Sequence, residues 1–235
     1  MTKRSRETVL PGAPPIAVQW RWHARARRMS LRVSQLDGRV TLTLPLRANP
    51  AVAEAFLHER SDWLRTALTR AHAPCPVAAG TLLPVAGRTL CVTPADTGAI
   101  AIAGGQLVVP TRGAPGPRIA AWLKLDARDR LAREVEGFAE KLGRAPRSLR
   151  LRDTRSRWGS CSSAGDLMFS WRLAMAPPEV LAYVAAHEVA HLAQMNHSPA
   201  YWETLAGLMP DYAAPRAWLR AEGAALHRFR FAAEA

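Results

Sequence analysis

The chain has 235 residues and is 49% hydrophobic, which is enough for one large domain or two small ones with apolar cores. No run approaches the roughly 20 apolar residues of a transmembrane helix, the arginine-rich start lacks the apolar stretch of a signal peptide, and three widely spaced cysteines exclude a disulfide framework, so we expect a cytoplasmic protein with reduced thiols. The formal net charge of +13 favours attraction of polyanions to the surface but does not indicate a fold.

Residues 1–113 are expected to form a β-rich region that contains one helix. Residues 16–46 read as strands, because apolar and polar side chains alternate and Asp37-Gly38 provides a tight turn. Residues 81–110 return to short strands, with Gly104-Gly105 as a second hairpin turn. The clearest alternation places three side chains on one face: Val40, Leu42 and Leu44.

The helix within this region is predicted to begin after Asn49, a capping residue that is followed by Pro50 at the first helical position. It is expected to continue as one helix to about Arg70. The apolar side chains expected to support it are Val52, Phe56, Trp63 and Leu64.

The Gly- and Pro-rich run at 112–117 is expected to link this region to the second half. A long helix follows, because apolar residues recur from Ile119 to Leu142 near a 3.6-residue period and Gly143 stands where a helix stop is expected. The next stretch, residues 148–175, has two β-prone runs on either side of SCSSAGD. It is predicted to form strands around a turn.

The helix that Pro177 and Pro178 open carries a pair of histidines. His187 and His191 are four residues apart, which corresponds to about 40° in azimuth on a helix, so both imidazoles project from one face and can hold one ion. Glu188 lies beside that face. Its carboxylate can therefore reach a water on the metal without being a metal ligand itself.

A third histidine follows a predicted break in this helix. Asn196 favours a turn and Pro199 cannot continue the helix, so the chain can bring His197 back toward the first two histidines. Three protein ligands leave one coordination position open, as in catalytic zinc sites, and nitrogen ligands favour zinc over magnesium or calcium. The alternative is a set of packed core histidines, which would leave several ring nitrogens without partners at about 1–3 kcal/mol each.

Basic residues concentrate in two segments of the chain. Residues 1–33 contain eight Lys or Arg and one Glu, and residues 141–157 contain seven Lys or Arg and one Asp. If the two segments met on one face, they would attract a polyanion such as nucleic acid. The chain also has twenty-nine arginines against three lysines, so a general arginine bias is an alternative explanation.

Four stretches of the chain together form a specific pattern. They are RSRWGSCSSAGDLMFSWRL at 155–173, APPEVLAYVAAHEVAHL at 176–192, NHSPAYW at 196–202, and the β-rich first half with RRMSLRV and GRVTLTLP. With this combination the chain resembles the YgjP-like zinc metallopeptidases, which are relatives of the SprT and WLM-type peptidases among the zincins. The resemblance spans most of the chain.

This resemblance implies an α+β fold in which residues 114–235 form a zincin-like helical catalytic domain with a small antiparallel sheet. It also implies that His187, His191 and His197 bind Zn²⁺ and that Glu188 is the general base. The spacing of His191 and His197 is also that of the metzincins, but Gln194 stands where their pattern has glycine. A metzincin assignment is therefore not favoured.

Zincins usually bind an extended peptide along the edge strand of the active-site sheet. The strand at Met168–Leu173 or the strand near Trp158 is expected to serve here. Residues 158–160 can equally be structural, and Cys161 is expected to be a buried thiol rather than a fourth ligand. The candidates for a hydroxyl that polarises the substrate carbonyl are Tyr183, Tyr201 and Tyr212.

The expected function is zinc-dependent hydrolysis of a protein or peptide substrate. Glu188 would take a proton from water and pass it to the leaving amine. One alternative is a non-catalytic basic module, in which zinc only staples the helices and nucleic acid binds to segments 1–33 and 141–157. Another is a protease that acts on DNA-bound proteins. The sequence does not indicate the oligomeric state.

Overall fold

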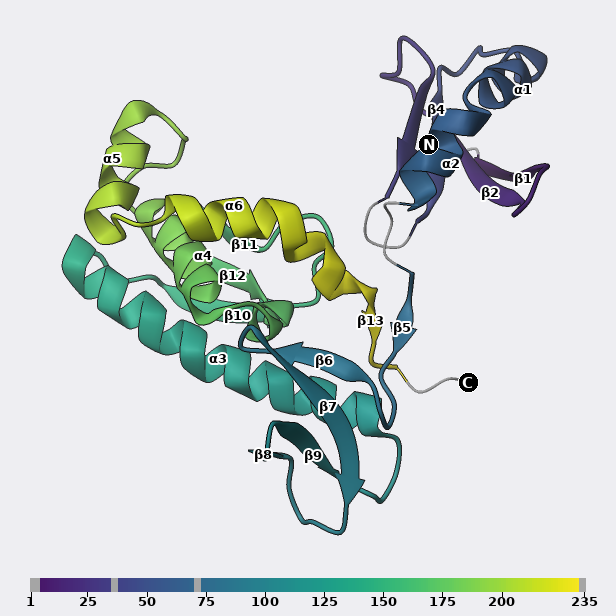
Figure 1. Ribbon diagram of the computed structural model, residues 1–235. Helices are drawn as coiled ribbons and strands as arrows, with labels where there is room; N and C mark the ends of the chain where they lie inside the picture. Colours follow the sequence, from purple (N-terminus) through teal and green to yellow (C-terminus); the bar gives the residue numbers. More distant parts are fainter. Residues whose placement is uncertain (1–4, 35–37, 70–72, 233–235) are drawn as a thin grey trace. The chain divides into compact units, whose positions relative to one another are not determined.

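The computed structural model describes residues 5–34, 38–69 and 73–232 (Figure 1). The chain forms two compact units, Met1–Pro74 and Cys75–Ala235, and each unit has its own hydrophobic core. None of the helices in the described ranges combines the length and the apolar content that crossing a bilayer requires. The fold is of the α+β type that the sequence predicts.

The first unit contains a four-stranded sheet in the order β1-β2-β4-β3. Its strands are β1 (Ser5–Leu10), β2 (Ile16–Trp22), β3 (Ser30–Val33) and β4 (Val40–Leu44). β2 and β4 run parallel, and the outer strands pair antiparallel with them. The predicted apolar face of β4 is confirmed, since Val40, Leu42 and Leu44 are buried. Asp37 of the predicted turn lies outside the described residues.

The helix predicted to run to about Arg70 is two helices, α1 (Pro50–Glu59) and α2 (Ser61–Thr69). Asn49 caps α1 as expected, because its Oδ1 accepts a hydrogen bond from the Ala51 N–H at 2.9 Å. Of the predicted apolar side chains, Val52 in α1 and Trp63 in α2 are about half exposed. The side chains that bury instead are Ala53 and Leu57 in α1, together with the predicted Leu64 in α2.

The second unit begins with short strands: β5 (Cys75–Pro76), β6 (Leu82–Val85), β7 (Arg88–Ala95), β8 (Ala101–Ala103) and β9 (Gln106–Pro110). The last four form a sheet in the order β6-β7-β9-β8. The predicted turn at Gly104-Gly105 is confirmed, because both glycines have positive φ angles, 55° and 74°, between the antiparallel strands β8 and β9.

The long predicted helix is α3 (Pro115–Leu142), which ends at Gly143 in the left-handed conformation at φ 70°. It runs from the β6–β9 sheet at one end toward α5 at the other (Figure 1). The buried residues of β7 and β9 belong to the same hydrophobic core as those of α3. The boundary predicted between residues 113 and 114 therefore falls inside the second unit, at the turn between β9 and α3.

A three-stranded sheet follows α3. Its strands are β10 (Ser148–Arg152), β11 (Gly159–Cys161) and β12 (Asp166–Ser170). β12 lies in the centre, parallel to β10 and antiparallel to β11, so the sheet is mixed rather than wholly antiparallel. Of the two strands considered for peptide binding, β12 is paired on both sides, whereas β11 has a free edge.

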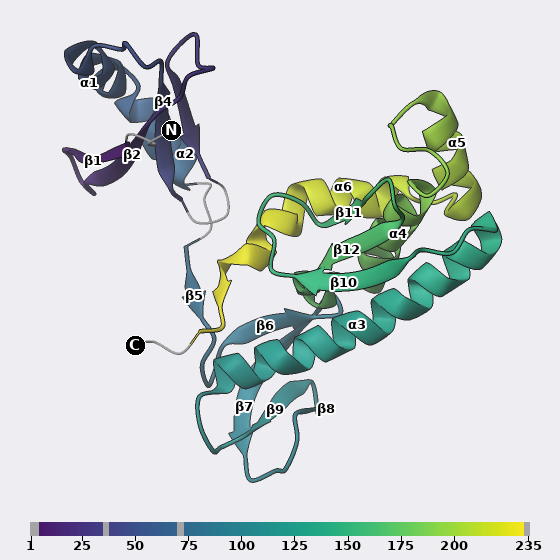
Figure 2. The ribbon, with the colours of Figure 1, turned by 180° about the vertical axis from the view of Figure 1, so that it is seen from behind.

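The remaining elements include α4 (Pro178–Ala190), the helix that carries the histidine pair. The others are the 3₁₀ helix η1 (Trp171–Met175), α5 (Pro199–Leu208), α6 (Ala213–Glu222), the 3₁₀ helix η2 (Gly223–Arg228) and β13 (Phe229–Arg230), which pairs with β5. α4 packs against α3, α5, α6 and β11 (Figure 2). It is therefore covered on almost every side, which explains why its sequence is apolar all round rather than along one stripe.

Candidate metal and catalytic site

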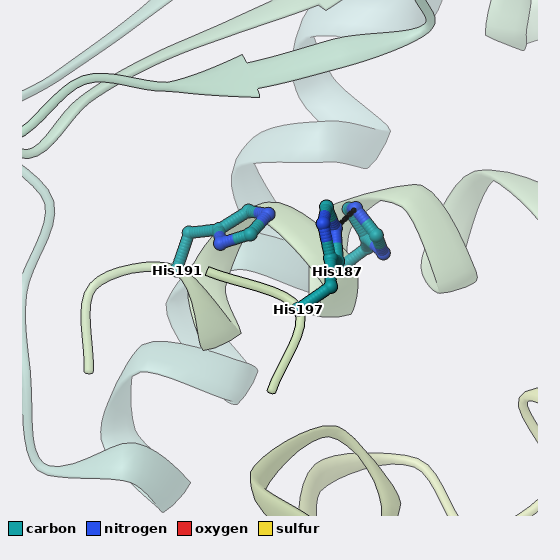
Figure 3. Close-up of side chains that lie close together, drawn as sticks. All are labelled: His187, His191 and His197. Carbon is teal, nitrogen blue, oxygen red and sulfur yellow. Dashed lines mark hydrogen bonds between the residues drawn. The ribbon is translucent and has the colours of Figure 1, made fainter. Parts of the chain in front are cut away.

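The structure brings His187, His191 and His197 together at the C-terminal end of α4 (Figure 3). Each of these residues offers one ring nitrogen, and these nitrogens all lie within 4.8 Å of one another. The closest pair is Nε2 of His187 and Nε2 of His197, at 3.2 Å. No carboxylate or cysteine sulfur belongs to this group of ligand atoms in the described chain.

Local sequence explains how the three rings meet. α4 ends at Ala190 and His191 is its C-cap, so the helix projects His187 and His191 from successive turns of one face. The chain then turns before α5 begins at Pro199. In this turn the Asn196 Oδ1 accepts a hydrogen bond from the Ser198 N–H at 3.3 Å. The return of the chain places the His197 ring beside that of His187 (Figure 3).

Neighbouring groups fix the orientation of the rings. The Gln194 carbonyl lies 2.9 Å from Nδ1 of His191, and since a carbonyl only accepts, Nδ1 donates and Nε2 keeps its lone pair for a ligand bond. Tyr201 on α5 is fully buried, and its hydroxyl donates to the His187 carbonyl at 3.0 Å. The Tyr201 ring centre lies 4.6–5.3 Å from those of all three histidines. Tyr201 is therefore the packing support of the cluster.

The donor set fits a metal better than a packed histidine cluster. Nδ1 of His187 is buried without a hydrogen-bond partner, and its Nε2 faces the Nε2 of another imidazole. Two nitrogens on one tetrahedral zinc, each at about 2.1 Å, lie about 3.4 Å apart, close to the observed separation. Burial, and then the neighbouring charges of His191 and His197, lower the pKa of His187 to about 4. The ring is therefore neutral at pH 7, as a metal ligand must be.

Glu188 lies next to this cluster and is only 5% exposed. Burial raises its pKa to about 8, although the positive charge of Arg157 acts in the opposite direction. Its carboxylate packs directly on Gly159 of β11, where a Cβ atom would lie 2.5 Å from Oε1. Gly159 thus allows the free edge of the sheet to approach the carboxylate.

The structure also places several residues whose roles the sequence does not decide. Cys161 is half-buried in β11, and burial, with the charge of Glu188, raises its pKa to about 11, so it is a thiol at neutral pH. Trp158 packs on His227 with ring centres 4.8 Å apart and also lines a cavity beside the metal cluster. Tyr183 lines the same cavity, whereas Tyr212 stacks on Trp202.

Two arginines of this cavity belong to no motif in the sequence. Arg216 and Arg220 lie on α6 and line the cavity together with His187 and His197. Their four-residue spacing places them on one helical face, which was the one available signal. Nothing in the sequence shows that this face meets the end of α4.

Comparisons with known proteins identify the family of the chain. The family model of the YgjP-like metallopeptidase domain matches residues 27–222. No curated protein matches the chain. Among solved structures, the metallopeptidase zymogen of Pyrococcus abyssi abylysin shares 21% sequence identity with this chain, covering 40% of it and 92% of the abylysin chain, with a TM-score of 0.35. The family match covers most of the sequence, and the chain therefore belongs to the YgjP-like metallopeptidase family.

Proposed function

We propose that this metallopeptidase uses zinc, held by His187, His191 and His197, and that Glu188 is its general base. The observation that carries the proposal is the meeting of three imidazole nitrogens with the buried carboxylate of Glu188, the residue that follows His187 on α4. Nitrogen donors without any carboxylate or carbonyl oxygen favour zinc over magnesium or calcium. The chemistry that zinc supplies when bound is polarisation of the scissile carbonyl and a lowered pKa for water.

Glu188 performs the proton transfers in this proposal. Its ionised carboxylate takes one proton from the attacking water as the new C–O bond forms, and it gives that proton to the leaving amine as the C–N bond breaks. The raised pKa of Glu188 supports this double role, because a carboxyl that titrates near neutral pH can both accept and release a proton there.

The peptide substrate is proposed to bind along β11. This strand is one of the two edge strands of its sheet, and it is the one whose Gly159 closely approaches Glu188 of α4. An extended peptide that pairs with β11 would form backbone hydrogen bonds as one more strand. Its scissile bond would then lie beside the carboxylate and the three imidazoles.

The test compares two Glu→Gln changes on the same helix. Glu188→Gln should abolish hydrolysis of a peptide library while the metal content per chain stays at the wild-type value. Glu179→Gln, in the exposed first turn of α4, is the matched control and should keep full activity. Wild-type activity in the Glu188 variant would exclude the mechanism. Absence of hydrolysis by the wild type under all metal loadings would favour the non-catalytic alternative.

A second candidate is a peptidase that acts on nucleic-acid-bound proteins. Three exposed arginines of the basic segment 141–157, namely Arg150, Arg152 and Arg157, line a cavity of about 610 Å³ together with Ser160 of β11. Phosphate groups would therefore find cations close to the proposed peptide edge. Affinity for labelled DNA that falls steeply with salt, and that weakens when these arginines become Gln, would support this candidate.

A further inference from the structure

The cavity beside the metal cluster is lined by two cations and no anion. It has a volume of about 450 Å³ and is bordered by His187 and His197 on one side and by Arg216 and Arg220 of α6 on another. The remaining walls are apolar or aromatic, and no acidic side chain takes part in the lining. A ligand in this cavity therefore meets positive charge next to the proposed reaction centre.

The Arg216 side chain is held in place by an aromatic stack. Its Cζ lies 4.5 Å from the centre of the Trp202 ring, and the Trp202 ring stacks on His197 with centres 5.8 Å apart. The guanidinium is therefore within about 10 Å of the His197 ring, or about three residues of extended peptide. Stacking uses the flat face of the guanidinium and leaves its N–H groups free to bind an anion at the edge.

Neither arginine is neutralised by the protein. Among the residues that the structure describes, no carboxylate forms an ion pair with Arg216 or Arg220. Arg216 is half-buried, and a partly desolvated charge without a counterion is unfavourable. The positive charge of Arg216 reaches the neighbouring groups: burial lowers the pKa of His187 and Arg216 adds to this, whereas burial raises the pKa of Tyr183 and Arg216 acts against this. A bound cation at the histidines would add to this excess of positive charge.

We propose that Arg216 and Arg220 form a subsite that binds a carboxylate of the peptide substrate within about three residues of the scissile bond. The subsite rests on the proposed peptidase function and specifies its substrate class. A planar carboxylate matches the paired N–H donors of a guanidinium, and the aromatic walls of Trp158 and Trp202 accommodate the aliphatic part of the ligand. The carboxylate comes either from an Asp or Glu side chain or from a free C-terminus.

The first experiment measures the substrate preference without assuming the sequence of the substrate. A proteome-derived peptide library is digested with the wild type, and cleavage positions are determined by mass spectrometry. Asp or Glu should be enriched within three residues of the cut, or the cuts should lie within three residues of the C-terminus. Matched Glu and Gln peptides, and matched free and amidated peptides, then separate the two sources. The preferred acid should exceed its neutral analogue about ten- to hundredfold in kcat/KM.

The second experiment assigns the preference to the two arginines. In Arg216→Gln/Arg220→Gln the ratio of acidic to neutral substrate should fall to about one, and Arg220→Gln alone, at an exposed position, should lower it in part. Arg133→Gln, an exposed arginine of α3 outside the cavity, is the control and should keep the wild-type ratio. An equal rate for acidic and neutral peptides in the wild type, or an unchanged ratio in the double variant, would overturn the subsite.

A binding measurement keeps the subsite separate from the chemistry. Fluorescein-labelled Glu and Gln peptides are titrated with metal-loaded Glu188→Gln, with and without the two arginine changes, and anisotropy gives the Kd. The Glu peptide should bind about tenfold more tightly than the Gln peptide only when both arginines are present. Equal affinities would overturn the subsite even if hydrolysis occurs. A preserved difference would support the subsite even if no peptide is cleaved, in which case the proposed peptidase mechanism fails alone.

Discussion

Replacing Gly159 with alanine should separate activity from metal binding. A Cβ atom at this position would lie 2.5 Å from Oε1, 2.6 Å from Cγ and 2.8 Å from Cδ of Glu188. Ordinary contacts between such atoms are about 3.5 Å, so the carboxylate must move by about 1 Å. A displacement of that size at a reacting group costs about a hundredfold in rate. We therefore expect kcat/KM to fall by about that factor in Gly159→Ala.

The assay measures peptide hydrolysis and metal per chain on the same preparation. Metal content should stay at the wild-type value, because the added methyl group faces the carboxylate and not the imidazoles. Gly207→Ala on α5 is the matched control, since no atom lies within 4 Å of its added Cβ, and it should keep full activity. Activity of Gly159→Ala within twofold of wild type, or loss of metal together with activity, would refute the reasoning.

Three further predictions concern pH and the core. Metal content after dialysis should fall as the pH is lowered from 7 toward 4, because protonated imidazoles cannot bind; full retention below that range would contradict three histidine ligands. Burial, then the charge of Arg172, lowers the pKa of His227 to about 4, so this residue alone should lower the free energy of unfolding by about 2 kcal/mol between pH 6.5 and 5, where the unfolded chain takes up the proton. The metal-free protein should lose more in total, because the pKa of His187 is also lowered to about 4, and in urea titrations His227→Phe should reduce that total loss by about 2 kcal/mol. Arg172 is buried, pairs with Asp153 at 2.7 Å and donates to the carbonyls of Leu226 and Phe229, so Arg172→Met should lower the free energy of unfolding by about 3 kcal/mol; an unchanged urea midpoint would exclude this role.

The secondary structure could be predicted where an element presents one face to the core. Such a face produces the alternation of apolar and polar residues in β4 and the 3.6-residue period of apolar residues in α3. The helix predicted to run through Arg60 was wrong because neither glycine nor proline marks the break there. The stretch at 112–117 has the composition of a linker, but it forms only a turn and the first residues of α3. Leu107 before it and Ile119 after it belong to one core, so the units separate elsewhere.

The candidate site divides into a local part and a part that the fold assembles. The three histidines and Glu188 lie within eleven positions of one another. Helix geometry and one helix break are therefore enough to predict that they meet. Gly159 and Arg216 come from elements on either side of α4 in the sequence, and only the packing of β11 and α6 against α4 places them at the site. In the proposed function the local residues bind the metal and transfer the proton. In the same proposal Gly159 and Arg216 set how closely the peptide and its carboxylate approach the metal. Changes in β11 or α6 should therefore alter the substrate preference and leave metal binding unchanged.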